Sequence, residues 1–313
     1  TPDTVLAKEA GLELGIKESI VVNDRMETSV PDIYAAGDAV QVKHYVTGND
    51  ALISLAGPAN KQGRIIADNI CGGDSRYLGS QGSSVIKVFD MTAATTGINE
   101  TNAKKSGLEV DTVILSPMSH AGYYPGGKVM TMKVVFEKET YRLLGAQIIG
   151  YEGVDKRIDV LATAIHAGLN ATQLKDLDLA YAPPYSSAKD PVNMAGFMID
   201  NIAKGTLKQW HLEDMDKISK DKDVVLLDVR TVGEFSMGHI DGFKNIPVDE
   251  LRERISEIEK GKPVYLICQS GLRSYIASRI LEGNGYETYN FSGGFRFYDA
   301  VVNDRALIER AYA

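Results

Sequence analysis

The sequence is short of cysteine and has no long apolar run. Of its 313 residues only two are cysteines, Cys71 and Cys268. They do not form the disulfide framework of a secreted protein, and they fit a reducing compartment in which a single cysteine can be catalytic. No apolar stretch approaches the roughly 18 residues of a membrane-spanning helix, and no secretory signal is recognisable. We therefore expect a cytoplasmic protein.

Basic residues are outnumbered by acidic ones. The chain holds 34 Lys and Arg against 42 Asp and Glu, a formal net charge of -8. This balance argues against a broad nucleic-acid or anionic-membrane surface, although it is compatible with a local basic pocket for a phosphorylated cofactor. The length allows two or three domains, and a composition of 44% hydrophobic and 24% charged residues is ordinary for a folded protein. We expect small molecules as partners, and neither nucleic acid nor membrane.

Cys268 occupies the most informative stretch of the chain, the seven residues 268–274. An apolar strand pattern precedes it at 264–267, and a helical pattern follows at 273–282. Backbone N–H groups at such a strand-to-helix turn, together with the helix dipole, favour a thiolate, which is the nucleophilic form of cysteine. Arg273 adds a permanent cation to the same loop. The alternative is an inert buried cysteine at the end of a strand.

The spacing between Cys268 and Arg273 indicates which chemical group the loop would hold. A phosphatase loop places five residues between its cysteine and arginine so that the backbone surrounds a tetrahedral oxyanion, whereas only four lie between them here. The shorter backbone loop encloses a smaller space, which suits one extra sulfur atom on the cysteine better than a phosphate. We therefore predict persulfide chemistry, in which the thiolate takes a sulfane sulfur and later passes it to a second thiol.

Near the other end of the chain, an expected strand at 33–36 runs into Gly37, Asp38 and Ala39. Small residues at a strand end allow a ligand to approach the backbone closely, and the aspartate can accept hydrogen bonds from sugar hydroxyls. A plain turn is the alternative interpretation. A helix is predicted at 58–70, with Cys71 at its end in a structural role.

Two aromatic islands are expected to be loops in the middle of the chain. One holds His120, Tyr123 and Tyr124, and the other holds Tyr181 and Tyr185. Their Pro and Gly residues favour rigid loops that present phenols, which are good donors to a thiolate or persulfide. Packing at an interface is the alternative role for all four tyrosines. Periodic patterns around the islands predict strands at 84–89 and 110–115, a hairpin of 129–136 with 141–149, and helices at 99–107, 154–165 and 190–202.

After an ordered linker that contains Trp210, alternating strands and helices begin. Strands are predicted at 224–230, 264–267 and 289–291, and helices at 248–258 and 273–282. This alternation implies a small parallel sheet with the Cys268 loop at the carboxyl end of a strand. Asp228, Arg230 and His239 are interpreted as framework residues.

Taken together, these motifs resemble known families. Residues 28–39 resemble the second flavin-binding signature of the pyridine nucleotide-disulfide oxidoreductases, and residues 79–203 resemble their dimerisation domain. The last hundred residues resemble a single-domain rhodanese, through Asp228-Val229-Arg230, Glu234-Phe235, Gly238-His239-Ile240, residues 268–274 and Gly293-Gly294. The whole chain is similar to coenzyme A-disulfide or persulfide reductases with a fused rhodanese domain.

The resemblance implies a fold and a set of sites. The fold class is α/β: part of an FAD-binding domain at 1–78, an α+β dimerisation domain at 79–203, a linker at 204–214, and a parallel α/β rhodanese domain at 215–313. Asp38 would hold the ribityl chain of FAD, with Gly37 and Ala39 beside it. Tyr123 and Tyr181 would serve the active site of the other subunit of a homodimer, with Tyr124 and Tyr185 packing against them.

The implied function is flavin- and NAD(P)H-dependent reduction of coenzyme A persulfide, polysulfide or coenzyme A disulfide. Cys268 would carry the sulfur and Arg273 would stabilise its loop; no metal site is expected. A Gly-x-Gly-x-x-Gly loop and the family's redox cysteine are absent, so we expect the chain to be the C-terminal portion of a longer polypeptide that alone neither binds FAD well nor accepts hydride. The alternatives are a stand-alone sulfurtransferase and a non-catalytic dimerisation and sulfur-sensing module.

Overall fold

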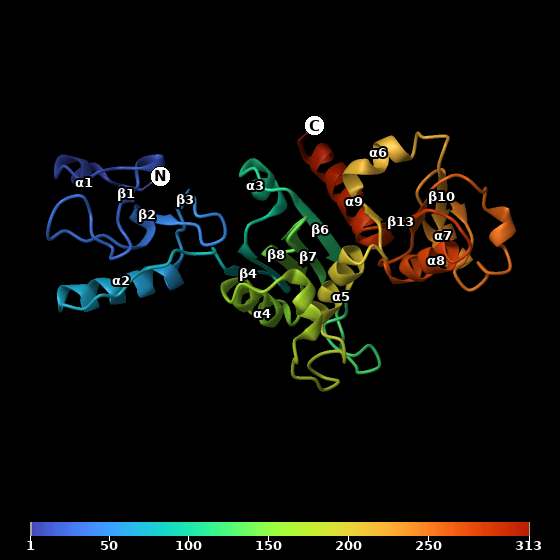
Figure 1. Cartoon of the computed structure of the whole chain (residues 1–313), viewed down its shortest axis with the longest axis horizontal. Coiled ribbons are helices and arrows are strands. Elements are labelled where there is room, and N and C mark those ends of the chain that lie inside the picture. Colours follow the sequence, from blue (N-terminus) through green and yellow to red (C-terminus); the bar gives the residue numbers. More distant parts are fainter. Residues whose placement is uncertain (1, 313) are drawn as a thin grey trace.

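Three sheets follow one another along the chain. The computed structural model describes residues 2–312. Figure 1 shows a small N-terminal unit at one end, a larger central unit, and a C-terminal unit at the other end. The mixed α/β class that the sequence predicts is confirmed, and the C-terminal sheet is parallel throughout.

The N-terminal unit is a three-stranded sheet with one long helix. Its elements are α1 (Val5–Glu9), the 3₁₀ turn η1 (Ile16–Glu18), β1 (Ile20–Val21), the 3₁₀ turn η2 (Gly37–Ala39), β2 (Val40–Lys43), β3 (Asp50–Ala51) and α2 (Ala56–Ile70). Strands β1 and β2 are parallel, and β2 and β3 are antiparallel. The predicted helix at 58–70 is confirmed and begins two residues earlier, at Ala56.

The strand predicted at 33–36 is wrong. Only Tyr34 pairs there, in a single bridge with Glu27. Asp32 has φ +64°, so the chain turns sharply just before the segment. The amide of Ala35 then donates to the carbonyl of Met26 instead of to a neighbouring strand. The apolar run therefore closes a local turn and leads directly into η2.

The central unit is an antiparallel sheet in the order β4-β5-β8-β7-β6. Its elements are β4 (Ser84–Val88), β5 (Met91–Gly97), α3 (Glu100–Lys105), β6 (Val110–Leu115), β7 (Thr131–Glu137), β8 (Leu143–Gly150), α4 (Val154–His166), η3 (Ala171–Asp176) and α5 (Pro191–Ala203). The predicted strands, hairpin and helices are confirmed. Strand β5 was not predicted, because a strand of Thr, Ala and Gly lacks the apolar alternation that marks a half-buried strand.

Helices α4 and α5 bury the centre of this unit. Helix α4 contacts β5 and β8, and α5 contacts β6 and η3. Val134, Leu144, Ile148, Leu161 and Ile199 are fully excluded from solvent in one continuous apolar core. This core fixes the ends of the strands, and the two tyrosine-bearing loops project from the unit beyond those ends (Figure 1).

The C-terminal unit is a parallel sheet in the order β11-β10-β12-β13-β9. Its elements are β9 (Gln209–Trp210), the 3₁₀ turn η4 (Leu212–Asp214), α6 (Met215–Ile218), β10 (Val225–Asp228), α7 (Val232–Met237), β11 (Lys244–Asn245), the 3₁₀ turn η5 (Ile255–Glu257), β12 (Val264–Ile267), α8 (Leu272–Glu282), β13 (Thr288–Phe291) and α9 (Gly294–Tyr312). The strand and helix predictions around Cys268 are confirmed.

The segment expected to be a linker packs against this unit and adds an edge strand to its sheet. Gln209 and Trp210 pair with Asn290 and Phe291 of β13. The Trp210 ring lies 4.7 Å from that of Phe291, and the residue is 2% exposed. The only tryptophan thus anchors the connection between the two larger units.

The helix predicted at 248–258 is wrong. The segment forms the short η5 and turns closed by bonds such as that from the amide of Leu251 to the carbonyl of Val248. Tyr286 Oη donates to the carbonyls of Ile255 and Ile258, at 3.2 and 3.1 Å. The amide of Val248 donates to Val229 at the end of β10. Tertiary hydrogen bonds at both ends therefore fix the path of the segment, and short turns follow that path in place of the helix that the periodicity suggests.

Polar contacts join the central sheet to the C-terminal sheet. The amide of Ile114 donates to Ser292 Oγ at 3.1 Å. Asp111 accepts hydrogen bonds from Gln209 Nε2 at 3.1 Å and from His211 Nε2 at 3.0 Å. Because these groups are half-buried or buried, the contacts fix the Cys268 unit in a defined position against the central unit.

Candidate functional site

Cys268 lies directly after β12, at the carboxyl end of the parallel sheet. The residue is 1% exposed. Its Sγ accepts a hydrogen bond from the amide of Gly271 at 3.1 Å. Ser274 Oγ lies 3.2 Å from the Sγ and 3.1 Å from the Gly271 carbonyl, so its one proton can be donated to either acceptor. An inert buried cysteine needs no such donors, whereas a thiolate or persulfide is stabilised by them. The sequence analysis gave Ser274 no role of its own.

The loop is held in shape from outside by the start of α9. The amide of Phe295 donates to the carbonyl of Cys268 at 2.8 Å, and that of Arg296 to Gln269 at 3.1 Å. Gly294 makes this contact possible: a Cβ on it would lie 2.7 Å from the amide nitrogen of Ser270, and its φ is +68°. The two Cys268 and Gln269 carbonyls therefore face α9, on the outside of the loop.

Gly271 connects the loop to the neighbouring strand as well as to α8. It precedes the first residue of α8 and has φ +99°, a left-handed conformation that favours glycine. Its amide faces Cys268, while its carbonyl accepts from Asn290 Nδ2 at 3.1 Å. One residue thus links the sulfur to β13.

Arg273 is held by a carboxylate from another helix. Both of its terminal nitrogens lie 2.7 Å from the two oxygens of Glu234 on α7. Hydrogen bonds from Arg273 lower the pKa of Glu234 to about 2, and those from Thr231 add to the effect. Arg273 therefore ties α8 to α7, and the loop-stabilising role inferred from the sequence stays a prediction. Glu234 was missed, although Thr231-x-x-Glu234 is a capping-box pattern visible in the sequence.

The residues interpreted as framework form a buried ion pair under the loop. Arg230 and Asp228 are 1% and 0% exposed, and Arg230 Nη2 lies 2.7 Å from Asp228 Oδ2. The guanidinium also lies 3.8 Å from the ring of Phe295 in α9 and donates to the carbonyl of Gly238. His239 is separate from this pair and stacks on Phe235 at 4.0 Å.

The two chosen tyrosines meet although 58 positions separate them. Tyr123 Oη and Tyr181 Oη lie 2.8 Å apart, and the residues are 78% and 45% exposed. The hydrogen bond to Tyr123 is the main cause that raises the pKa of Tyr181, so the Tyr181 phenol keeps its proton at neutral pH. Tyr124 packs edge-to-face on His120 instead, at 5.6 Å.

A buried ion pair that the sequence analysis missed supports both tyrosine loops. Arg157 is 1% exposed, and its Nη2 lies 3.0 Å from Asp190 Oδ2. The same nitrogen donates to the carbonyl of Ser119 at 2.9 Å and to Ser186 Oγ at 3.1 Å, so it holds the bases of the two loops. Arg157 interrupts an apolar helix face, which is the one sequence signal that could have identified it.

Asp38 lies in η2 between Gly37 and the half-buried Ala39. Its carboxylate is exposed and forms no hydrogen bond or ion pair with another described residue. Gly37 has φ +81°, and its amide donates to Gln62 Oε1 on α2 at 2.7 Å. Helix α2 has no side-chain cap on its first amides. A free carboxylate beside uncapped amides fits a polyhydroxylated, phosphate-bearing group.

The structure does not join these places to one another within one chain. No hydrogen bond or ion pair among residues 2–312 links the tyrosine pair or Asp38 to the Cys268 loop. Cys71, given a structural role from the sequence, is exposed at the end of α2. No cluster of His, Cys, Asp and Glu in the described part of the chain could hold a metal ion. Within the same residues, no helix has the length and apolar character needed to cross a bilayer.

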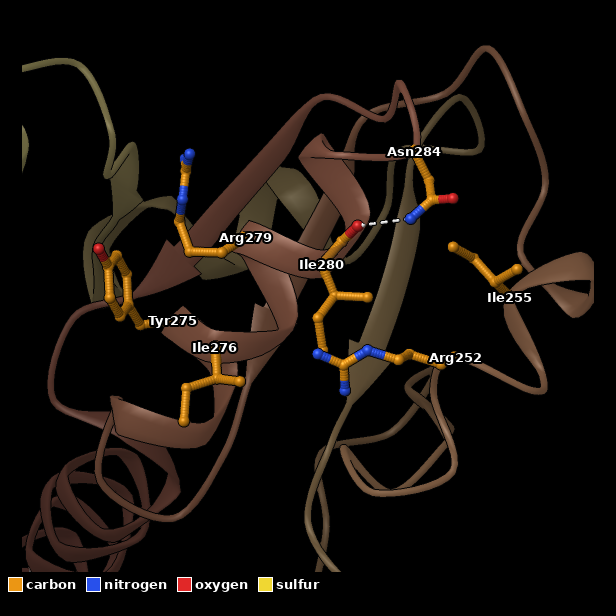
Figure 2. Close-up of a pocket in the computed structure, with 7 residues that line it drawn as sticks. All are labelled: Arg252, Ile255, Tyr275, Ile276, Arg279, Ile280 and Asn284. Atoms are coloured by element: carbon orange, nitrogen blue, oxygen red, sulfur yellow. Dashed lines mark hydrogen bonds between the residues drawn. The ribbon is translucent and has the colours of Figure 1, made fainter.

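A basic hollow of about 530 Å³ lies on the outer face of α8. Figure 2 shows Arg252, from the segment between β11 and β12, facing Ile276 and Ile280 of the helix. Asn284 closes one side and donates to the carbonyl of Ile280 at 2.8 Å. None of the loop residues 268–274 lines this hollow, so it is separate from the Cys268 site.

Three family models match the chain, one in each unit. Residues 1–63 match the pyridine nucleotide-disulphide oxidoreductases, residues 83–191 match their dimerisation domain, and residues 211–300 match the rhodanese-like domain.

Solved structures of similar proteins extend these matches over nearly the whole chain. The structure of reduced Bacillus anthracis CoADR-RHD is 47% identical over 97% of this chain, with a TM-score of 0.94. A NAD-dependent persulfide reductase from A. fulgidus is 41% identical over 95%, with a TM-score of 0.87. A curated relative, the CoA-dependent NAD(P)H sulfur oxidoreductase of Pyrococcus furiosus, is 39% identical over 61% of the chain. The chain spans about half the length of these relatives, at 55%, 54% and 43% respectively.

Proposed function

Because the chain belongs to the pyridine nucleotide-disulphide oxidoreductases and ends in a rhodanese-like domain, we propose that it is part of a reductase of coenzyme A persulfide, polysulfide or disulfide. The reductase would depend on a flavin and on NAD(P)H. In it, Cys268 carries sulfane sulfur as a persulfide. The names of its relatives support this proposal, since two of them are described as persulfide or sulfur reductases.

The single observation that carries the proposal is the pair of donors on Cys268 Sγ. The amide of Gly271 donates to it, and the hydroxyl of Ser274, which can turn its proton from the Gly271 carbonyl to a charged sulfur, lies 3.2 Å away, inside a backbone turn that α9 holds closed. The Cys268 thiolate attacks the outer sulfur of a donor such as thiosulfate; a new S–S bond forms, the donor S–S bond breaks and sulfite leaves. The persulfide then stays in reach of the same donors until a thiolate removes its outer sulfur.

The residues around Asp38 supply part of a flavin site in this proposal. The exposed, unpaired Asp38 carboxylate would accept hydrogen bonds from the ribityl hydroxyls, while Gly37 and Ala39 let the chain approach the backbone. The uncapped start of α2 offers amide donors beside it. When bound, the flavin would supply hydride chemistry, which no side chain provides. Dinucleotide-binding and redox residues beyond this chain would complete the site.

Tyr123 and Tyr181 are proposed to act in the reductive half of the reaction. Their mutual hydrogen bond and their exposure leave one phenol proton free to donate to a persulfide or thiolate of the substrate. A homodimer would place the pair at the partner's flavin. Exposed apolar side chains on the β4–β5 hairpin, such as Ile86 at 61% and Phe89 at 94%, support an extensive contact with another surface. The free state of both cysteines supports a cytoplasmic location.

A stand-alone sulfurtransferase is the second candidate. It is favoured by the fact that the Cys268 site uses only residues of the C-terminal unit, whereas the Asp38 site is partial. A sulfurtransferase would transfer sulfur without any flavin. The full-length reductase would bind a flavin and oxidise NAD(P)H only when a sulfane-sulfur substrate is present.

The test of the Cys268 role is transfer of sulfur from thiosulfate to cyanide. Replacement Cys268→Ser removes the nucleophile, so transfer should fall to background, a loss of about 10³-fold or more. The matched control is Cys71→Ser, which alters the exposed cysteine at the end of α2 and should keep the wild-type rate. Transfer that survives in the Cys268→Ser chain would assign the reaction to another residue.

A further inference from the structure

The carbonyl of Gly271 is crowded by three hydrogen-bond donors. The amide of Tyr275, the side-chain Nδ2 of Asn290 and the hydroxyl of Ser274 each lie 3.1 Å from its oxygen. A carbonyl oxygen has two lone pairs, so it accepts well from only two donors at once. One of the three donors is therefore in surplus at this position.

The hydroxyl of Ser274 is the donor that can turn away from this carbonyl. The Tyr275 amide is held in the first turns of α8, and the Asn290 side chain is held in β13, where the residue is 4% exposed. A hydroxyl rotates freely, and its other acceptor is Cys268 Sγ, 3.2 Å away. Because Tyr275 and Asn290 fill both lone pairs, the Ser274 proton is directed to the sulfur.

The side-chain amide of Asn290 is not explained by the stability of the fold. Its Oδ1 is buried and forms no hydrogen bond with any described residue. A buried acceptor without a partner lowers stability, and a leucine of similar shape would avoid that cost. The Gly271 carbonyl can only accept a hydrogen bond, so the Nδ2 end of the amide must face it. The amide is therefore placed for its effect on that carbonyl.

We propose that Asn290 is a positioning residue for the Cys268 sulfur, because by occupying the Gly271 carbonyl it frees the Ser274 hydroxyl to donate to a charged Sγ. This inference rests on the proposed sulfur-carrying function of Cys268. The sulfur Sγ carries negative charge twice in each cycle, before it attacks the donor and after the acceptor has taken the outer sulfur. At both points it has the Gly271 amide, at 3.1 Å, and the Ser274 hydroxyl as donors.

Release of sulfur is the step that this arrangement assists most. Cyanide attacks the outer sulfur of the Cys268 persulfide, a C–S bond forms, and the S–S bond breaks. The electron pair of that bond stays on Sγ, so the products are thiocyanate and the Cys268 thiolate. Because negative charge grows on Sγ as the bond breaks, a hydroxyl that turns toward it stabilises the transition state. Without the Asn290 amide, the hydroxyl would remain on the Gly271 carbonyl.

The experiment loads the full chain with sulfur from thiosulfate and measures the rate at which cyanide removes it. Ser274→Ala removes the donor and should slow release by about tenfold or more. Asn290→Leu should slow release by about three- to tenfold, because the Ser274 hydroxyl then fills the lone pair left empty on Gly271. The double variant should be no slower than Ser274→Ala alone, since Asn290 acts through that hydroxyl.

Two control variants make the same substitutions away from the sulfur. Ser278→Ala alters a buried serine one turn further along α8, whose hydroxyl donates to the Tyr275 carbonyl at 2.7 Å. Asn284→Leu alters an amide beyond the end of α8 that donates to the Ile280 carbonyl at 2.8 Å. Both should release sulfur at the wild-type rate. Thermal unfolding should also show Asn290→Leu to be at least as stable as wild type, which separates a positioning role from a structural one.

Wild-type release in Asn290→Leu would overturn the proposal, and so would additive losses in the double variant. If Ser274→Ala fails to fold, the rate and stability of Asn290→Leu decide alone. If the wild-type chain takes up no sulfur, the sulfur-carrying function of Cys268 fails, and the role of Asn290 is judged on the free cysteine. The ultraviolet absorbance of the thiolate at neutral pH, measured against Cys268→Ser, should then be smaller in Asn290→Leu than in wild type; an unchanged absorbance would reject that role.

Discussion

Glu234 shows how much a single carboxylate contributes to the Cys268 site. Its carboxylate accepts hydrogen bonds from both terminal nitrogens of Arg273, at the start of α8, and forms the capping box of α7 with Thr231. One side chain thus holds the starts of two helices. Bidentate guanidinium–carboxylate pairs are directional as well as strong. Glu234 therefore fixes the position of Arg273, the predicted stabiliser of the loop, although it makes no hydrogen bond to the sulfur.

The Glu234 pair should make the stability of the C-terminal unit fall in acid. The folded-state pKa is about 2 against 4.5 for the ordinary carboxyl, so the contribution is complete above pH 4.5 and is lost as the pH falls towards 2. The measurement is urea unfolding of wild type and Glu234→Gln across this range. The difference in unfolding free energy should be largest near neutral pH and should shrink in acid; a difference that does not vary with pH would contradict the account.

Residues of this kind mark the limit of what the sequence alone predicts. Cys268 and the two tyrosine loops were identified from local patterns of strand, turn and helix or of loop residues, and Tyr123 and Tyr181 were chosen within the loops through the family resemblance. Arg157, Glu234 and Asn290 matter through partners 33, 39 and 19 positions away, and no local pattern records such pairing. Burial of a charged or polar side chain becomes interpretable only when its partner is known.

At the scale of elements, the start of α9 is what shapes the Cys268 loop. Its first amides bind the carbonyls of Cys268 and Gln269, and Gly294 allows the close approach. The Asp228–Arg230 pair contacts the same helix, because the Arg230 guanidinium packs on the ring of Phe295. Breaking that buried pair by removing one partner would cost about 3–5 kcal/mol.

Gly294→Ala should damage sulfur transfer more than it damages the fold. The new Cβ would lie 2.7 Å from the Ser270 amide nitrogen and 2.8 Å from the Cys268 carbonyl oxygen, and φ +68° is unfavourable for alanine. We expect transfer to cyanide to fall by about 10²-fold, because the displaced loop no longer presents its donors to the sulfur.

Gly285→Ala is the matched control for that variant. Gly285 also has a positive φ, of +84°, but a Cβ there would meet no atom within 4 Å. Gly285 follows the opposite end of α8 from the loop, so alanine there introduces similar backbone strain without a clash against the loop. Kinetics and thermal unfolding of the two variants therefore separate the effect of strain from the effect of the clash. Equal loss of transfer in both would show that the close approach of Gly294 is unimportant.

Element prediction succeeded where local periodicity and tertiary structure agree. The strands around the central hairpin and the strand and helix that flank Cys268 follow their apolar patterns. The segment expected to be a helix at 248–258 instead follows a path fixed by hydrogen bonds of its ends to Val229 and Tyr286, and β5 was missed because its small side chains lack apolar alternation. In both cases contacts with distant parts of the chain, which no local pattern records, accompany the observed conformation.

At the scale of the whole molecule, the central and C-terminal units are joined by specific polar contacts, and this has a consequence for stability. Burial alone would raise the pKa of Asp111, but hydrogen bonds from His211, Thr112 and Gln209 outweigh it and lower the pKa overall. The carboxylate therefore stays charged at neutral pH and holds the segment that enters the C-terminal sheet.

Asp111→Ala should loosen the docking of the two units. Removal of the carboxylate leaves its donors on Gln209 and His211 without that partner, which should cost about 1–3 kcal/mol. We expect cleavage by a protease between residues 203 and 215 to become faster and the thermal midpoint to fall. Asp178→Ala, an exposed aspartate with no ion pair among the described residues, is the control and should behave as wild type.

Whether Cys268 carries the sulfur is tested most directly by measuring the mass of the chain after exposure to thiosulfate and removal of excess reagent. The wild-type protein should gain the mass of one sulfur atom. Peptide mapping should place this sulfur on Cys268, and cyanide should remove it. The Cys268→Ser chain should gain nothing, while Cys71→Ser should behave as wild type. Sulfur found on Cys71, or on no cysteine at all, would contradict the assignment of Cys268 as the sulfur carrier.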